Sequence, residues 1–180
     1  MSYYLARAFF YPSLAYNIFM ENVSSRNWYD RVDRNLILGA LPLRYKVPEL
    51  LQKENVGAVV SLNENYELHL TPTTEEWKSW GVENIQFQIV DLFEAPSQDT
   101  LLRGVNFIDE KISSNKVVYV HCKAGRSRSA TMVACYLMKK YSWTAEKAIS
   151  HLRDKRPHIM LPYNKVEALE TFYSTHVANS

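Results

Sequence analysis

Cys122 lies where the sequence brings together a possible nucleophile and an anion-binding loop. An apolar run at residues 117–120 precedes it, and a loop of small and basic residues ends six positions later at Arg128, which Ser129 follows. A strand that turns through such a loop into a helix aims backbone N–H groups at the loop's centre, and the helix N-terminus adds about half a positive charge. Because this field favours a thiolate, we expect Cys122 to have a lowered pKa and to attack a bound phosphate.

The residues around Cys122 have the chemistry that holding a phosphate requires. The planar guanidinium of Arg128 can grip two phosphate oxygens and stay bound as charge moves in the transition state. Ser129 places a hydroxyl beside the sulfur, and Gly125 permits the tight backbone that turns successive N–H groups inward. We expect His121 to orient the loop through hydrogen bonds rather than to transfer protons. The remaining residues expected to bind the substrate's phosphate are Lys123, Ala124, Arg126 and Ser127.

The segment HCKAGRSRS at residues 121–129 resembles the signature loop of the protein tyrosine phosphatase superfamily. The residue types, the spacing from cysteine to arginine, the apolar strand before the loop and the helix after it all agree with that pattern. The resemblance implies a single-domain cysteine-phosphatase fold that hydrolyses phosphomonoesters through a phosphocysteine intermediate. The sequence has no residue spacing typical of a metal site, so neither a metal nor another cofactor is expected.

Breaking a phosphomonoester also requires a carboxylic acid that protonates the departing oxygen. In the superfamily this acid comes from a loop upstream of the cysteine, and Asp91 lies thirty-one residues before Cys122, directly after an apolar run. The resemblance therefore implies that Asp91 is the general acid, although this chain has Ile89 and Val90 where larger members have Trp-Pro. Glu94 is the alternative acid, and a turn or capping role is the alternative for Asp91.

A closer resemblance is carried by three segments, NWYDRVDRNLILGALP, VVSLNENYEL and HCKAGRSRSATMVACYLM. With their spacing they look like the mitochondrial phosphatidylglycerophosphate phosphatase family, from Trp28 to the last expected helix. The resemblance implies dephosphorylation of phosphatidylglycerophosphate to phosphatidylglycerol, on the route to cardiolipin, at the matrix face of the mitochondrial inner membrane. The implied partners are an anionic phospholipid substrate and that membrane surface. Without the resemblance, two free cysteines indicate only a reducing compartment, such as the cytoplasm.

Residues 63–67 read NENYE, where the family's motif after its second strand reads Glu-Glu-Tyr-Glu. Glu64 then matches the first glutamate, and Asn65 replaces the second. Tyr66 and Glu67 are retained. The resemblance implies lipid recognition or loop positioning for this segment, and a surface turn is the alternative.

Lys123 and Arg126 give the loop two cations beyond Arg128. Phosphatidylglycerophosphate has a phosphodiester beside its terminal phosphomonoester, so these two side chains are candidates to bind the second phosphate. Solvated loop charges are the alternative.

Two other functions fit the same loop. A dual-specificity protein phosphatase acting on phosphotyrosine, phosphoserine or phosphothreonine would use the same catalytic residues, and its partners would be phosphoproteins. A non-catalytic phosphate-binding adaptor is disfavoured, because Cys122 and Arg128 are both present.

The rest of the chain fits one α/β domain that positions this loop. At 180 residues it is long enough to bury about 70% of its unfolded surface. Its net charge of +2 argues against general nucleic-acid binding. Cys135 falls among apolar helical positions and is expected to be a small buried hydrophobe.

Short apolar runs predict strands at 36–39, 57–62, 84–90 and 117–120. Helical patterns cover 47–55, 100–113, the stretch after Ser129, the stretch from Thr144 to Pro157, and 165–172. This alternation predicts a central parallel or mixed sheet flanked by helices.

Residues 1–27 stand apart from the expected phosphatase domain at 28–180. The first twenty residues contain seven aromatic side chains, one basic residue and no acid. Their uncharged run at 8–20 is shorter than the about 20 residues that a membrane span needs, and Pro12 interrupts it. The aromatic rings favour a segment that associates with lipid headgroups or directs the chain to an organelle. Packing on the domain's own core is the alternative.

Overall fold

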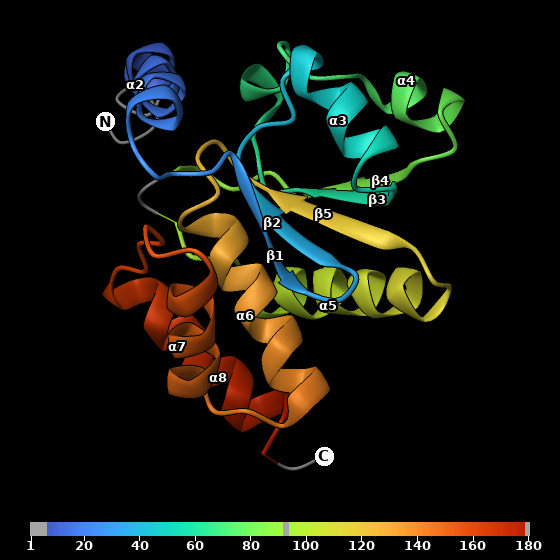
Figure 1. Cartoon of the computed structure of the whole chain (residues 1–180). Coiled ribbons are helices and arrows are strands. Elements are labelled where there is room, and N and C mark those ends of the chain that lie inside the picture. The colour runs from blue at the N-terminus through green and yellow to red at the C-terminus, as the bar shows by residue number, and fades with distance from the viewer. Residues whose placement is uncertain (1–6, 92–93, 179–180) are drawn as a thin grey trace.

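A five-stranded mixed sheet forms the centre of the computed structural model, which describes residues 7–91 and 94–178. The strand order is β1-β2-β5-β3-β4 (Figure 1). The strands are β1 (Tyr29–Asp33), β2 (Leu36–Gly39), β3 (Val56–Ser61), β4 (Glu83–Gln86) and β5 (Val117–His121). β2, β3, β4 and β5 run parallel, whereas β1 at the edge is antiparallel to β2. The four parallel strands therefore end at one edge of the sheet, where the loop after β5 begins.

Helices cover both faces of this sheet (Figure 1). One face carries α3 (Val47–Gln52) and α4 (Thr74–Ser79). The other face carries α5 (Gln98–Ser113) and α6 (Arg128–Tyr141), with α7 (Ala145–Lys155) and α8 (Tyr163–His176) packed against α6. Two short 3-10 turns, η1 (Arg44–Lys46) and η2 (Asn65–Glu67), lie in the connections. The expected α/β class, with a mixed sheet flanked by helices, is confirmed.

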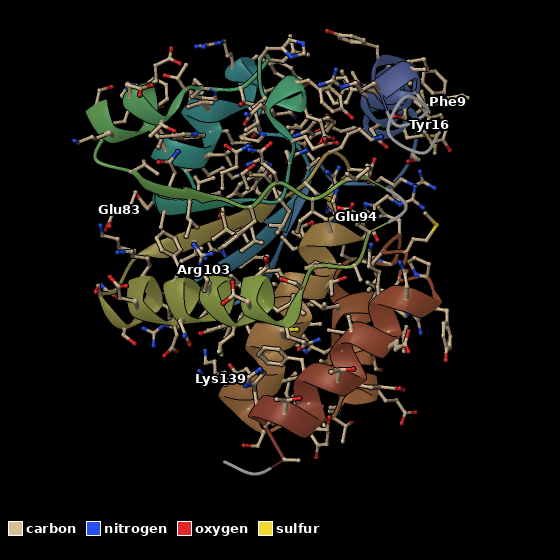
Figure 2. All side chains as sticks on the ribbon, turned by 180° about the vertical axis from the view of Figure 1, so that it is seen from behind. Phe9, Tyr16, Glu83, Glu94, Arg103 and Lys139 are labelled. Carbon is tan, nitrogen blue, oxygen red and sulfur yellow. The ribbon has the colours of Figure 1, made fainter. Side chains whose placement is uncertain are left out.

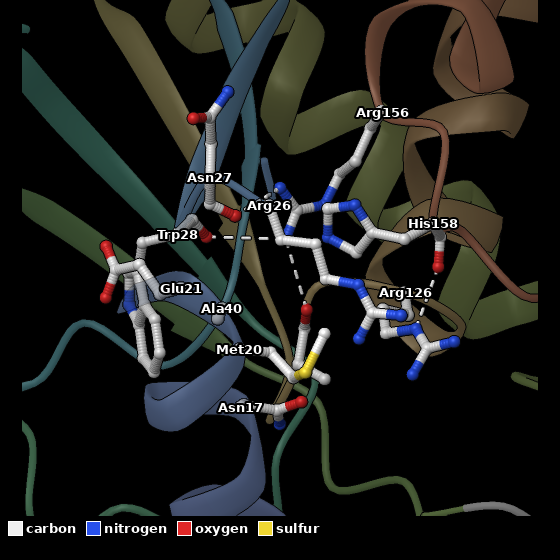
Figure 3. A pocket seen from close by; sticks show the side chains of 11 residues that line it. Asn17, Met20, Glu21, Arg26, Asn27, Trp28, Ala40, Arg126, Arg156 and His158 are labelled. Atoms are coloured by element: carbon white, nitrogen blue, oxygen red, sulfur yellow. Dashed lines mark hydrogen bonds between the residues drawn. The ribbon is translucent and has the colours of Figure 1, made fainter. Parts of the chain in front are cut away.

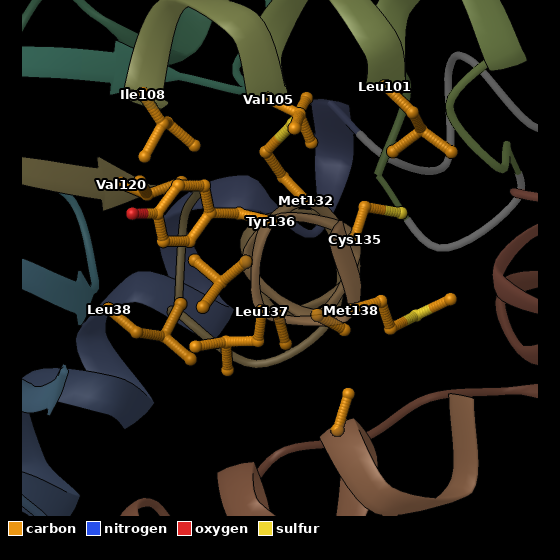
Figure 4. Close-up of a cluster of buried hydrophobic side chains, with 14 of the residues drawn as sticks. Leu38, Leu101, Val105, Ile108, Val120, Met132, Cys135, Tyr136, Leu137 and Met138 are labelled. Atoms are coloured by element: carbon orange, nitrogen blue, oxygen red, sulfur yellow. The ribbon is translucent and has the colours of Figure 1, made fainter. Parts of the chain in front are cut away.

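Helix α6 lies at the centre of the larger hydrophobic core (Figure 4). All of its residues from Arg128 to Met138 are buried, because the sheet, α5, α7 and α8 surround it. Leu38 and Val120 from the sheet and Leu101 from α5 belong to the same cluster. A helix enclosed in this way has a fixed first turn, and that turn begins where the loop after β5 ends.

Most of the expected elements are present, and the differences have physical causes. The strand expected at 84–90 stops at Gln86, because β3 ends at Ser61 and the Phe87 N–H makes its bond to the Ser61 carbonyl at 2.8 Å. The sequence patterns gave no expectation of β1 or α4. Helix α4 does have a local signal, since Thr73 and Glu76 form a capping box at its start.

The N-terminal segment forms helix α2 (Phe10–Val23), which lies beside the edge where the parallel strands end (Figure 1). Phe10 and Leu14 are buried in a small apolar cluster whose other members are Trp28, Ala40, Leu41 and Leu43. Large apolar side chains that this segment exposes are Phe9, Tyr11, Tyr16, Phe19 and Val23. Across the described ranges, no helix combines the length and the apolar character that crossing a membrane requires. The segment therefore packs on the domain through one side and exposes apolar surface on the rest.

Candidate active site

The loop after β5 makes a tight turn that ends at the first residue of α6. Gly125 has a positive φ of 64°, a conformation that favours glycine. A Cβ at this position would lie 2.4 Å from the carbonyl carbon of Gly39, so no side chain fits there. Ser127 precedes α6 without a side-chain hydrogen bond to the helix. The first N–H groups of α6 are therefore not capped by this side chain and can face an anion.

Arg156 holds the back of the same loop. Its buried guanidinium donates hydrogen bonds to the carbonyl oxygens of Gly125 at 2.8 Å and Ala124 at 3.2 Å. An ion pair with Asp30 at 2.5 Å balances its charge. Because the N–H and C=O of a peptide unit point in opposite directions, fastening these carbonyls outward turns the following N–H groups inward. Arg156 is therefore a positioning residue for the phosphate-binding loop.

Cys122 is only 3% exposed, and the hydroxyl of Ser129 donates to its Sγ at 3.2 Å. Burial has the largest influence on the thiol and opposes its ionisation. The charge of Arg128 and the hydrogen bonds from Ser129 act in the other direction, and the net result is a pKa of Cys122 below its ordinary value. The sequence predicts the same direction.

Arg128 is fully buried and is fixed by several partners. Its Nη1 donates to Oε2 of Glu67 at 2.7 Å and to the carbonyl oxygens of Leu62 at 3.0 Å and Ile89 at 2.9 Å. Its Nη2 donates to Oε1 of Glu67 at 3.0 Å. Burial lowers the pKa of Arg128, but the Glu67 and Asp91 carboxylates raise it more, so it stays charged. The buried Nε has no hydrogen-bond partner within the described residues. Since an unpaired buried donor is costly, this edge of the guanidinium suits a phosphate oxygen.

Asp91 lies beside the loop and pairs with two of its cations. Its carboxylate contacts the Nζ of Lys123 at 2.5 Å and the Nη2 of Arg128 at 3.2 Å. The exposed Glu94 instead accepts a hydrogen bond from the N–H of Val90 at 3.2 Å, within its own loop. Of the two candidate acids, Asp91 is the one that borders the space above Cys122.

A pocket of about 290 Å³ opens at Cys122. Its base is polar, because Asp91 and the loop residues Lys123, Ala124, Arg126 and Ser127 line it. The opposite wall comes from the N-terminal segment and contains two aromatic rings, Phe9 and Tyr16. Its other lining residues are Ser13, Asn17 and Met160. Figure 2 shows Phe9 and Tyr16 at the same end of the molecule as Glu94. The pocket can therefore hold a phosphate at its base and an apolar group at its wall.

The comparison with protein families agrees with this geometry. Residues 37–175 match the model of the dual specificity phosphatase catalytic domain. That span contains Asp91 and the entire loop from Cys122 to Arg128. The chain belongs to this family. It is a cysteine-dependent phosphatase.

Curated relatives of this phosphatase match nearly all of it. "Phosphatidylglycerophosphatase and protein-tyrosine phosphatase 1" of Rattus norvegicus is 43% identical over 180 residues, which cover 98% of this chain and 93% of the relative. The protein of the same name from Homo sapiens is 42% identical and covers 98% of this chain and 90% of its own length. The crystal structure of PTPMT1 in complex with PI(5)P is 40% identical in sequence, with a TM-score of 0.82, and covers 85% of this chain and 99% of that chain.

The residues of the NENYE segment lie outside the lining of the phosphatase's Cys122 pocket. Glu67 is fully buried behind Arg128 and holds it with both carboxylate oxygens, the geometry of loop positioning. Glu64 is buried at the start of the same turn, and its N–H donates to Glu67 at 2.9 Å. Tyr66 packs edge-to-face against Phe10, with ring centroids 5.6 Å apart. Glu64 and Tyr66 thus shape the turn and its contact with the N-terminal segment rather than border the pocket.

His121 also lies outside the lining of this pocket. Its ring lines a separate cavity of about 360 Å³, which Ser61 and Thr71 also border. Burial above all lowers the pKa of His121 to about 3, so the ring is neutral. A neutral ring that lines another cavity does not border the phosphate-binding space, and the orienting role of His121 stays a prediction.

Sequence reasoning missed two buried cations of this phosphatase. Arg156 contacts Gly125 across thirty-one residues of chain, and no local pattern connects the two. Lys165, in the first turn of α8, is fully buried, and its Nζ has no hydrogen-bond partner among the residues described. Burial, followed by the charge of Arg128, lowers the pKa of Lys165. A lysine within a helical pattern usually indicates a solvated face, so the sequence contains no signal for its burial.

Proposed function

We propose that this phosphatase hydrolyses the phosphomonoester of phosphatidylglycerophosphate and releases phosphatidylglycerol, on the route to cardiolipin. The observation that carries the proposal is the position of the N-terminal segment, since Phe9 and Tyr16 form a wall of the pocket that opens at Cys122. A headgroup phosphate held at Cys122 would leave the rest of the lipid beside aromatic rings, which favour the membrane interface. The printed names of the two relatives support the same substrate.

In the proposed first step, the Cys122 thiolate attacks phosphorus and the bond from phosphorus to the glycerol oxygen breaks. The N–H groups of the loop and the free edge of Arg128 hold the remaining phosphate oxygens and stabilise the charge of the transition state. Asp91 gives its proton to the departing oxygen. The negative charge of the bound phosphate favours the protonated form of Asp91, because it competes for Lys123 and Arg128. The products of this step are phosphatidylglycerol and a phosphocysteine.

Water completes the proposed cycle. The Asp91 carboxylate accepts a proton from the attacking water, whose oxygen bonds to phosphorus as the bond to Sγ breaks. The Ser129 hydroxyl, 3.2 Å from Sγ, stabilises the departing thiolate. Inorganic phosphate leaves, and Cys122 and Asp91 return to their starting forms.

The exposed side of α2 is the proposed contact with the lipid surface. Phe19 is 59% exposed and Phe9 is 58% exposed, on a segment whose other side is fixed to the domain through Phe10 and Leu14. Tyr163, just after the pocket residue Met160, is also exposed. Aromatic rings in this arrangement suit a headgroup boundary. We place the enzyme at the matrix face of the mitochondrial inner membrane, as the family resemblance implies.

Turnover on phosphatidylglycerophosphate in vesicles, compared with phosphopeptides at matched concentrations, tests the substrate. We expect faster release of phosphate from the lipid, with no loss of activity in the presence of a chelator. Faster turnover of phosphotyrosine or phosphoserine peptides would favour a dual-specificity protein phosphatase. Loss of activity to the chelator, with recovery on adding magnesium, would contradict the phosphocysteine route.

Replacement of Phe19 and Val23 by serine tests the lipid contact, because both side chains are exposed and neither lines the Cys122 pocket. We expect binding to anionic vesicles to fall at least about tenfold, since a tenfold change corresponds to about 1.4 kcal/mol and full burial of a single apolar side chain is worth about 1.5–3 kcal/mol. Trp80→Ser is the matched control, because Trp80 is an exposed aromatic residue that follows α4, away from α2. Equal losses in both variants would mean that α2 is not the contact.

A further inference from the structure

A second basic site adjoins the Cys122 pocket and is formed by Arg26 and Arg126. Arg126 belongs to the loop and borders the Cys122 pocket. Arg26 follows α2, and the two side chains line the same niche of about 20 Å³. Figure 3 shows their guanidinium groups beside each other. Asn17 and Ala124 border both the niche and the Cys122 pocket, so the two spaces meet along Arg126.

The positive charge of this niche is not balanced by carboxylates. Arg126 donates its Nε–H to the carbonyl oxygen of His158 at 2.8 Å, which leaves its two Nη groups for other partners. In the part of the chain that the structure describes, neither Arg26 nor Arg126 has an ion pair with an acid. Glu21 also lines the niche, but Lys46 binds it at 2.6 Å. Burial, and then the charge of Arg26, lowers the pKa of Arg126.

Lys123, the other spare cation of the loop, does not join this site. Its Nζ contacts Asp91 at 2.5 Å, on the side of the pocket where the acid lies. Of the pair expected from the sequence, Lys123 with Arg126, only Arg126 lines the niche. Arg26, which lies 100 residues before Arg126 in the sequence, is instead the arginine that lines the niche with Arg126.

We infer that Arg26 and Arg126 form a subsite for a second phosphate group on the same substrate molecule, next to the phosphate that is cleaved. The inference rests on the proposed function, because phosphatidylglycerophosphate has a phosphodiester close to its phosphomonoester. The niche has room for about one water-sized group, so the second phosphate sits at its mouth, where both guanidinium groups can bind it. An anion there also relieves the repulsion between the two arginines, and arginine suits bidentate binding of phosphate.

Arg26→Gln tests the subsite with two soluble substrates, so that membrane binding plays no part. The substrates are a short-chain phosphatidylglycerophosphate, used as a monomer in solution, and glycerol phosphate, which has a single phosphate. We expect the ratio of kcat/KM for the first over the second to fall about tenfold, as loss of one partly solvated charge-assisted contact predicts. Arg126→Gln should lower the ratio at least as much. Arg34→Gln is the matched control, because this exposed arginine lies in the turn after β1 and is not in the lining of either pocket.

Equal losses on both substrates, or an unchanged ratio, would overturn the subsite. A second experiment does not depend on lipid turnover. It measures how strongly a three-carbon diphosphonate and propylphosphonate inhibit the hydrolysis of an aryl phosphate. We expect the unmodified enzyme to bind the diphosphonate about tenfold more tightly, and Arg26→Gln to lose that preference. If the lipid is not hydrolysed but the preference depends on Arg26, the proposed function fails and the subsite stands. If the lipid is hydrolysed and no preference exists, the subsite fails alone.

Discussion

Cys122 and Cys135 are both buried, at 3% and 0% exposure, yet the pKa values of their thiols shift in opposite directions. Burial raises the pKa in both cases, because a thiolate loses solvation in the protein interior. At Cys135 burial prevails, and the pKa lies well above its ordinary value. At Cys122 the charge of Arg128 and the bonds from Ser129 outweigh it. Burial alone therefore does not make a cysteine inert; the charges and donors around the sulfur decide.

The difference follows from where each cysteine lies relative to α6. Cys122 precedes the helix N-terminus, where free N–H groups and an arginine favour an anion. Cys135 lies inside the same helix, where the backbone groups are bonded and the neighbours in the core are apolar. The helix thus anchors the reactive loop at one end and buries a thiol within its length without activating it.

Cys122→Ser and Cys135→Ala should separate the two sites most strongly. We expect Cys122→Ser to abolish hydrolysis of an aryl phosphate, because a serine hydroxyl is not ionised at neutral pH. The variant should still bind phosphate or vanadate, since the loop and Arg128 remain. Cys135→Ala should retain the activity of the unmodified enzyme. Measurable turnover by Cys122→Ser, or inactivity of a folded Cys135→Ala, would remove the distinction.

The sequence predicts the difference between the two cysteines, because the role expected for each follows from its neighbours in the chain. All the types that mark the reactive loop lie within residues 121–129, and the helical period alone places Cys135 among apolar positions. The expected strands at 36–39 and 117–120 are found as β2 and β5, the latter extending to His121. These features depend on local spacing, which a sequence shows directly.

The contacts that tune the loop could not be predicted in this way. Glu67 reaches Arg128 across sixty-one residues, and Arg156 reaches Gly125 across thirty-one. The family resemblance pointed to the segment containing Glu67 but left its role open between lipid and loop. Such pairs exist only because the sheet and α7 bring distant segments together, and no periodicity records them. For the same reason the sequence pointed to Lys123 and Arg126, which are neighbours in the loop, and gave no signal for Arg26.

Asp91→Asn should separate proton donation from thiol activation. We expect kcat on glycerol phosphate to fall about 100-fold, with a smaller loss on an aryl phosphate whose leaving group needs little protonation. The charge of Asp91 raises the pKa of Cys122, so its removal should lower that pKa further and speed alkylation of the thiol by iodoacetamide in mildly acidic buffer. Glu94→Gln is the control, because Glu94 caps its own loop. Should only Glu94→Gln show the leaving-group dependence, Glu94 is the acid.

Ser129→Ala should shift the reactive thiol toward the behaviour of Cys135. The hydroxyl of Ser129 stabilises the thiolate of Cys122, so its removal should raise the pKa of that thiol. We expect alkylation by iodoacetamide in mildly acidic buffer to slow about three- to tenfold, and the acidic limb of the kcat/KM profile to move to higher pH. An unchanged profile would mean that Arg128 and the backbone alone set the pKa.

Cys135→Ala should have the smallest effect, and on stability rather than catalysis. Removal of a fully buried sulfur leaves a small cavity in the core around α6, so the free energy of unfolding should fall about 1–2 kcal/mol at neutral pH. The folded-state pKa of Cys135 is raised above that of the unfolded chain. The contribution of this thiol to the free energy of unfolding is therefore fully present below the unfolded thiol pKa of about 8.5 and is lost as pH rises toward the folded value. The difference in free energy of unfolding between the unmodified enzyme and Cys135→Ala, measured in urea titrations, should therefore become smaller at alkaline pH. Cys122 is common to both proteins and cancels in this difference. A difference in free energy of unfolding that stays constant or grows with pH would show that Cys135 is not a neutral thiol in the folded state.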